Sequence, residues 1–216
     1  EALVNQLPIP VMHDDQHGTA VVVLASLLSA TRGVRVSLQE SIVGQIGLGA
    51  AGLGIARLLM AYGIKQVLGT DLNQESIARL ESMGGQRCDL EELMARADVV
   101  VATTGVQGLV KAEWVRPGQV ILALTNPEPE IEPELALSKG AAYAADGKSV
   151  NNVLAFPGVF RGALDASATK ITKEMLIAAA LCLHTRAPKD ELVPDPLERS
   201  VHVAVADAVA RASSQT

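Results

Sequence analysis

Aromatic residues are nearly absent from this sequence. Rings make up 2% of its 216 residues, whereas hydrophobic residues of all kinds make up 49%. A core of stacked rings is therefore excluded, and the interior has to be built from Ala, Val, Leu and Ile. Together with 18 glycines, this composition favours parallel strands that alternate with alanine-rich helices in one large domain.

Positive charge, long apolar runs and cysteine are also scarce. The chain has 24 acidic and 18 basic residues and no long basic segment, which argues against a nucleic-acid partner. Its longest apolar stretch, Ala20 to Ala30, is too short to cross a bilayer and follows no basic leader. Cys88 and Cys182 form no CxxC pair, so we expect reduced structural thiols. A soluble, cytoplasmic protein is predicted.

The hydrophobic pattern alternates between two kinds of segment. Ala20 to Ala30 is apolar nearly all round and predicts a buried helix. Short runs rich in Val, Ile and Leu predict strands, and the stretches between them predict helices. The expected fold class is therefore α/β, a Rossmann-like doubly wound parallel sheet with flanking helices. The predicted strands are Ser41 to Ile46, Gln66 to Asp71, Asp98 to Thr104, Gln119 to Thr125 and Ala141 to Asp146, and the clearest later helices are Ala50 to Ala61, Gln74 to Met83, Lys170 to His184 and Leu197 to Ala212.

Three glycines in GxGxxG spacing, Gly47, Gly49 and Gly52, lie between the first strand and the next helix. In dinucleotide sites the first such glycine makes a tight turn, the second lets the backbone approach a pyrophosphate, and the third lets helix and sheet pack closely. The helix N-terminus adds free N–H groups for the phosphates. Turns that serve packing alone can have the same spacing, so a second residue has to support the prediction.

Asp71 supplies that support, 24 positions after Gly47 at the end of the second predicted strand. A carboxylate there can accept hydrogen bonds from the hydroxyls of an adenosine ribose. The next residues are Leu72 and Asn73, so no Arg or Lys is at hand to neutralise a 2′-phosphate. NAD is therefore favoured over NADP. The alternative is that Asp71 only caps the helix that begins near Gln74.

A polar segment, HDDQHGTA from His13 to Ala20, directly precedes the buried helix. Asp14 and Asp15 repel each other unless a cation or helix-end N–H groups compensate, so one of them is a candidate ligand of a hard divalent metal. Capping of the helix is the alternative. His13 and His17 would suggest zinc on a continuous helix, but the nearby glycine and prolines favour a loop there.

Four strings in this order resemble the bacterial malic enzymes: IPVMHDDQHGTAVVVLASLL, the glycine motif, ALTNPEPEI and VNNVLAFPGVFRGAL. The resemblance covers nearly the whole chain and implies the NAD-binding domain of that family. Residues 1–17 would be linker and metal-site motif, 18–170 the Rossmann core and 171–216 the C-terminal helices. The chain begins at Glu1 and enters the motif almost at once, so we expect a fragment without its N-terminal catalytic domain.

The resemblance also implies roles for individual residues. Asp15 corresponds to a ligand of Mg²⁺ or Mn²⁺, and Asp14 to a neighbour that contacts the catalytic lysine. Asn126 and Asn152 match positions that hydrogen-bond malate, which a neutral amide can do without adding charge. Both also have structural explanations, since Asn-Pro forms turns and Asn151 or Asn152 could cap the next helix. The expected cofactor-binding residues are Thr19, Gly47, Gly49, Ala50, Ala51, Gly52, Asp71 and Thr103.

The implied activity is oxidative decarboxylation of (S)-malate to pyruvate and carbon dioxide, by a homodimer that uses NAD and a divalent metal. The family takes a tyrosine acid, a lysine base and two more acidic ligands from its N-terminal domain. Tyr62 and Tyr143 lie in the wrong motifs to replace that tyrosine, so the chain alone is expected to be inactive. Two segments depart from the family pattern: residues 146–150 run directly into the paired asparagines, where the family usually has a longer segment, and Thr103 to Val110 has an unusual sequence.

Three alternatives stay open at this point. A malolactic enzyme would recycle tightly held NAD and release lactate. A noncatalytic NAD-binding module could regulate a partner, although it would have no use for the acidic and amide groups of the motifs. The nucleotide domain of an amino-acid dehydrogenase would share the architecture without the HDDQHGTA segment.

Overall fold

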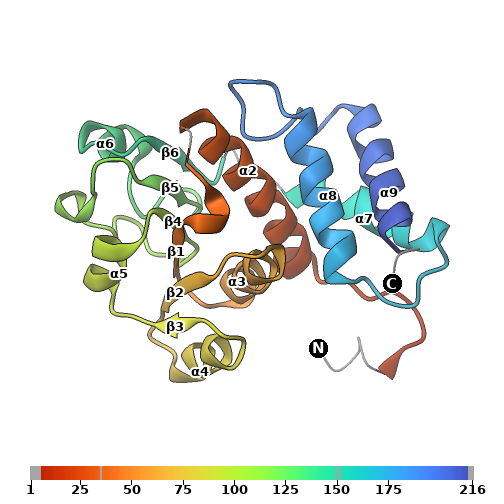
Figure 1. Ribbon diagram of the computed structural model, residues 1–216, viewed down its shortest axis with the longest axis horizontal. Helices are drawn as coiled ribbons and strands as arrows, with labels where there is room; N and C mark the ends of the chain where they lie inside the picture. Colours follow the sequence, from red (N-terminus) through yellow and green to blue (C-terminus); the bar gives the residue numbers. More distant parts are fainter. Residues whose placement is uncertain (1–5, 35, 149, 151, 214–216) are drawn as a thin grey trace.

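Six parallel strands form one sheet in the order β3-β2-β1-β4-β5-β6 (Figure 1). The structure is a computed structural model that describes residues 6–34, 36–148, 150 and 152–213. The strand order reverses between β1 and β4, so the predicted doubly wound sheet is confirmed. The strands are β1 (Ile42–Ile46), β2 (Gln66–Thr70), β3 (Gln86–Arg87), β4 (Val99–Ala102), β5 (Val120–Ala123) and β6 (Tyr143–Asp146).

The central strands are covered on both faces, which explains their continuous apolar sequence. Every residue of β4 and β5 is buried. In the register, Val43 of β1 lies opposite Val67 on one side and Val99 on the other. Strand β3 was not predicted, because this edge strand is two residues long and both residues are exposed and polar.

Helices cover both faces of the sheet (Figure 1). On one face α2 and α3 pack against the strands, and α8 and α9 form a further layer outside α2; on the other face lie α5 and α6. The short α5 and α6 were not predicted. The helices are α2 (Thr19–Val34), α3 (Ala50–Tyr62), α4 (Gln74–Ser82), α5 (Leu90–Arg96), α6 (Pro133–Ser138), α7 (Phe156–Asp165), α8 (Lys173–Arg186) and α9 (Arg199–Ser213), with single turns η2 (Leu38–Glu40), η3 (Ala112–Trp114) and η4 (Asn152–Leu154) and a π-helix η1 (Asp14–Gly18).

Helix α2 is the central helix of the core, as predicted from its apolar sequence. Val21, Val22, Val23 and Leu24 are all 0% exposed. With η1 in front, the continuous helix Asp14–Val34 is longer than the predicted one and is long and apolar enough to cross a membrane by length and composition alone. However, 67% of its most apolar window is buried inside the protein, so packing against α3 and α8 accounts for its composition.

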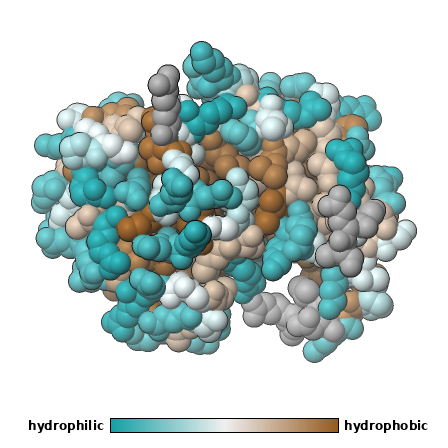
Figure 2. All heavy atoms as spheres, viewed as in Figure 1, coloured by the Kyte–Doolittle hydropathy of each residue, from teal (hydrophilic) through white to brown (hydrophobic). Residues whose placement is uncertain are grey.

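The surface in the same view is largely hydrophilic (Figure 2). Hydrophobic residues gather near the middle of this face, between the sheet and the C-terminal helices (Figure 2).

Both cysteines are free, as predicted. Burial raises the pKa of the Cys88 thiol to about 11, which keeps it protonated and unreactive at neutral pH.

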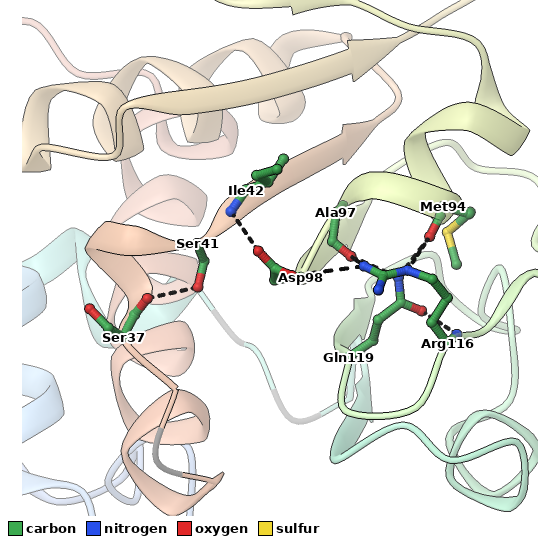
Figure 3. A network of polar contacts seen from close by, with 8 residues as sticks. All are labelled: Ser37, Ser41, Ile42, Met94, Ala97, Asp98, Arg116 and Gln119. Carbon is green, nitrogen blue, oxygen red and sulfur yellow. Dashed lines mark hydrogen bonds and ion pairs between the residues drawn. The ribbon is translucent and has the colours of Figure 1, made fainter.

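A network of polar groups, with the buried Gln119 at its centre, joins the loops at the amino-terminal edge of the sheet (Figure 3). The amide nitrogen of Gln119 donates to the carbonyl oxygens of Met94 and Ala97, both at 2.8 Å, and its oxygen accepts from the backbone N–H of Arg116 at 2.7 Å. The carboxylate of Asp98 accepts from the backbone N–H of Ile42 at 3.0 Å. Loops at this edge are therefore fixed by side chains, far from the carboxyl edge where parallel sheets of this kind bind ligands.

Candidate functional site

The turn after β1 has a geometry that requires glycine. Gly47 has φ +85°, and a Cβ there would lie 2.7 Å from the carbonyl oxygen of Thr103. A Cβ on Gly52 would lie 1.9 Å from the carbonyl oxygen of Gly47, so α3 can begin this close to the turn only without a side chain. At Gly49, the N-cap of α3, no atom of the described residues lies within 4 Å of the Cβ position. Open space therefore adjoins the helix N-terminus, as a dinucleotide turn needs.

Gln45 stabilises this turn through hydrogen bonds of its side-chain amide. It was not singled out from the sequence. Its side chain is 0% exposed. Its amide nitrogen donates to the carbonyl oxygen of Gly47 at 3.1 Å and to the hydroxyl of Thr103 at 2.9 Å. Thr103, which follows β4, is thereby tied to the glycine turn. Gln45 could have been identified from the sequence, because it is a polar residue inside the apolar run of β1.

Asp71 lies directly after β2, beside the same turn. One carboxylate oxygen accepts from the backbone N–H of Leu48 at 2.6 Å, and the other from that of Asn73 at 2.8 Å. Helix α4 is capped by Asn73, whose side-chain oxygen accepts from the N–H groups of Glu75 and Ser76. The alternative that Asp71 itself caps this helix is therefore wrong.

The HDDQHGTA segment is helical, so the prediction of a loop there was wrong. Asp14–Gly18 forms a π-helix that continues into α2. The carbonyl oxygen of His13 accepts from the N–H of His17 at 2.8 Å, and the Nδ1 atom of His17 accepts from the N–H of His13 at 3.0 Å. These bonds supply the start signal that the nearby prolines and glycine had obscured. The ring nitrogen of His17 is thus engaged with the backbone.

The carboxylate of Asp14 lies in an unfavourable electrostatic environment next to Asp15. One of its oxygens accepts from the side-chain amide of Asn152, and the other is buried with no hydrogen-bond partner among the described residues. Burial raises the pKa of Asp14, and the adjacent charge of Asp15 raises it further, while His13 opposes them. A buried carboxylate oxygen without a donor is costly, so this atom is suited to a cation or an N–H donor from outside these residues.

A pocket of about 380 Å³ opens at the carboxyl edge of the sheet. It brings together residues that are far apart in the sequence, and it includes six of the predicted site residues. The other predicted residues, namely Asp14, Gly47, Gly49, Ala50, Gly52 and Asp71, do not line it. The lining consists of Asp15, Thr19, Ala51, Thr103, Gly105, Leu124, Thr125, Asn126, Val150 and Asn152.

The two asparagines reach this pocket from different elements. Asn126 follows β5 and forms a cis peptide with Pro127. Asn152 begins η4, and its amide donates to Asp14. Helix α7 has Ala155 as its N-cap, so a capping role for Asn152 is not observed; the same alternative for Asn151 falls on a residue outside the described ones. Neither Tyr62 nor Tyr143 lines the pocket.

Residues 70–213, more than half of the chain, match the model of the family described as "Malic enzyme, NAD binding domain". The chain belongs to this family. A second model, the NAD-binding domain of D-isomer specific 2-hydroxyacid dehydrogenases, matches residues 19–109, which hold the glycine turn common to such folds. The family match extends beyond this segment to the C-terminal helices, and it therefore distinguishes a malic enzyme domain from a general dinucleotide-binding domain.

Relatives of this malic enzyme domain are longer than the chain. "NAD-dependent malic enzyme 1" of Bacillus subtilis is 58% identical over 99% of this chain, which covers 49% of that protein. The crystal structure of malic enzyme from Pyrococcus horikoshii superposes with a TM-score of 0.89 at 34% identity, over 99% of this chain and 57% of the other. The chain thus spans about half the length of the relatives it matches.

The lengths of the alignments differ between relatives. The "Bifunctional malic/malolactic enzyme" of Bacillus subtilis, 37% identical, aligns over 243 positions, although this chain has 216 residues. At least 27 of those positions therefore have no counterpart here. By contrast, the relative with 58% identity aligns over 214 residues and 99% of this chain, so that alignment contains no insertion of this size.

Proposed function

We propose that this chain is the NAD-binding domain of an enzyme that converts (S)-malate to pyruvate and carbon dioxide with NAD and Mg²⁺ or Mn²⁺. The shared pocket carries the proposal: Asp15, Asn126 and Asn152 line it beside Thr19 and Ala51. The pocket thus combines a carboxylate that can bind a metal with two neutral amides, and it lies next to the glycine turn. This combination suits the oxidation of a small hydroxy acid by a dinucleotide. Relatives named NAD-dependent malic enzymes support the same reaction.

NAD would be held by the glycine turn and by Asp71. Gly47 and Gly52 keep the backbone close enough for the N-terminus of α3 to receive a pyrophosphate, and Gly49 leaves the space for it. When bound, NAD supplies the acceptor for the hydride that leaves C2 of malate. Asp71 would accept from the ribose hydroxyls, since each of its oxygens has a free lone pair besides its backbone bond.

The metal would be held in part by Asp15. When bound, a divalent cation polarises the hydroxyl and carboxylate oxygens of the substrate. The described residues contain no group of three or more His, Cys, Asp or Glu that could hold a metal ion, so further ligands have to come from elsewhere in the protein. The partnerless oxygen of Asp14 is suited to a lysine from the same source.

The residues of this chain would mainly bind and orient the substrate. The amides of Asn126 and Asn152 can donate to the carboxylates of malate without adding charge. Asp15 is the only ionisable side chain among the described residues that line the pocket. A general acid and base must therefore be supplied by the other half of the protein, which we propose is an N-terminal catalytic domain. We further propose a cytoplasmic homodimer.

A malolactic reaction is the second candidate, because one relative is named a bifunctional malic/malolactic enzyme. The two outcomes differ in the fate of the reduced cofactor. Accumulation of NADH during malate consumption by the full-length protein would support the malic reaction. Release of lactate without NADH would support the malolactic one.

The test of the proposal is calorimetric titration of the protein with NAD and NADP, followed by an assay of malate-dependent NADH formation. We expect NAD to bind, and turnover to require the full-length protein and a divalent metal. A noncatalytic regulatory module would bind NAD but show no turnover at full length. Failure of NAD to bind would contradict the proposal outright.

Replacement of Asp71 tests the preference for NAD. Asp71→Asn retains the size and one oxygen but removes the charge that would repel a 2′-phosphate and strengthen bonds to ribose hydroxyls. Hydrogen bonds to charged groups contribute about 1.5–3 kcal/mol, so we expect NAD affinity to fall about tenfold and the ratio of NADP to NAD affinity to rise. Titration with both nucleotides measures this, and an unchanged ratio would show that Asp71 does not face the ribose.

A further inference from the structure

Glu130 is a fully buried carboxylate that the sequence analysis did not single out. It is 0% exposed and lies in the segment between β5 and α6, behind the pocket rather than in its lining. A buried charge is retained only where donors compensate for its lost hydration. The bonds of Glu130 therefore indicate what it is there to hold.

Among the described residues, two threonines donate the hydrogen bonds that the Glu130 side chain accepts. Its Oε1 atom accepts from the backbone N–H of Thr104 at 2.7 Å, from the hydroxyl of Thr104 at 2.9 Å and from the hydroxyl of Thr125 at 2.6 Å. Its Oε2 atom accepts from the backbone N–H of Thr125 at 3.2 Å. Thr104 follows β4 and Thr125 follows β5, so one carboxylate joins the carboxyl ends of two adjacent strands.

The two threonine hydroxyls also accept hydrogen bonds, and these connect the network to the loop after β4. Each hydroxyl accepts from a backbone N–H, that of Gly105 for Thr125 at 2.9 Å and that of Val106 for Thr104 at 3.1 Å. Because a backbone N–H can only donate, each hydroxyl has its own hydrogen left for Glu130. The main chain of Glu130 contributes as well, since its carbonyl accepts from the N–H of Val110 at 2.9 Å.

The loops held in this way form one wall of the pocket. Thr103 and Gly105 come from the connection after β4, and Thr125 and Asn126 from the connection after β5. The glycine turn and Asp71, which would hold the adenosine and pyrophosphate of NAD, belong to β1, β2 and α3. The network of Glu130 therefore supports the end of the site where malate and the reacting end of the cofactor would meet.

We propose that Glu130 is a positioning residue that sets the spacing of the β4 and β5 loops and thereby the placement of Asn126 against malate. This inference rests on the function proposed above. An amide cannot replace the carboxylate, because its NH₂ group would face an N–H donor in place of an acceptor. Misplacement of a substrate-binding group by a fraction of an ångström is enough to slow a reaction, because catalysis depends on orientation.

Gln119 provides a matched control. It is also buried, at 1% exposure, and also joins loops through three hydrogen bonds, but at the opposite edge of the sheet (Figure 3). Loss of a purely structural network should lower the melting temperature equally at either edge. Only Glu130 should affect the handling of malate.

The experiment compares the full-length protein with its Glu130→Gln, Thr104→Val and Gln119→Leu variants. For each we would measure the melting temperature, the affinity for NAD by calorimetry, and KM and kcat for malate. Glu130→Gln should raise KM for malate about tenfold and lower kcat about tenfold, with NAD affinity changed less than threefold. Thr104→Val, a milder change with one hydroxyl removed, should shift KM in the same direction by about threefold. Gln119→Leu should lower the melting temperature alone.

The outcomes separate this inference from the function on which it rests. If the unaltered protein neither binds NAD nor consumes malate, the proposed function fails. If it does both, and Glu130→Gln and Thr104→Val keep its KM and kcat, the positioning role is overturned. An equal loss of activity in Gln119→Leu would overturn it too, because the effect would then follow stability alone.

Discussion

Asp15→Asn should slow malate turnover by the full-length protein about a thousandfold. Asp15 lines the pocket beside Asn152 and Thr19, and asparagine keeps its size while removing the charge that a hard cation requires. Metal catalysis contributes several kcal/mol to stabilisation of the transition state, and each 1.36 kcal/mol corresponds to a factor of ten in rate. The measurements are kcat/KM with saturating Mg²⁺ and the affinity for Mn²⁺.

The fold and the nucleotide site should be unaffected by this change. Asp15 is exposed and does not contribute to the glycine turn, so NAD affinity should stay within about twofold of the original. Asp165→Asn is a suitable control, because Asp165 lies in an exposed ion pair with Arg161 on α7, a type of pair worth at most about 0.5 kcal/mol. If Asp15→Asn keeps both Mn²⁺ affinity and activity, Asp15 is not a metal ligand.

The geometry of the glycine turn could be predicted because backbone sterics restrict which residues fit there. Gly47 needs a positive φ and Gly52 a missing Cβ, so the spacing of glycines records the shape of the turn. The strands β1, β2, β4 and β5 were predicted for a similar reason, since strands covered on both faces are mostly apolar. By contrast, β3 has two exposed polar residues and leaves no hydrophobic pattern.

The parts that escaped prediction depend on contacts between distant segments. The start of the helix at Asp14 is set by bonds of His13 and His17 that a sequence pattern does not reveal, so glycine and proline misled the prediction toward a loop. Glu130 resembles an ordinary surface acid in the sequence EPE, and only the meeting of β4 with β5 explains its burial. Likewise, no local sequence motif predicts the contact between Asn152 and Asp14, because the two residues are 138 positions apart in the sequence.

Gly49→Ala and Gly52→Ala should separate binding from folding at the glycine turn. At Gly52 the added Cβ would lie 1.9 Å from a backbone oxygen, so turn and helix must move apart, at a cost of about 1–3 kcal/mol for overpacking. For a domain of this size each kcal/mol lowers the melting temperature by about 2–4 °C. The Cβ of Gly49→Ala meets no described atom within 4 Å, so its melting temperature should stay unchanged.

Both variants should nevertheless lose NAD affinity by at least about tenfold. The methyl of Gly49→Ala would occupy the open space at the N-terminus of α3, where a pyrophosphate has to approach the backbone, whereas Gly52→Ala displaces the turn itself. Calorimetric titration with NAD and thermal unfolding without it measure the two effects separately. Gly33→Ala is the control, because its Cβ is also free of described neighbours but lies in α2, away from the turn. Unchanged NAD affinity in Gly49→Ala would mean that the glycine turn serves packing and that the nucleotide binds elsewhere.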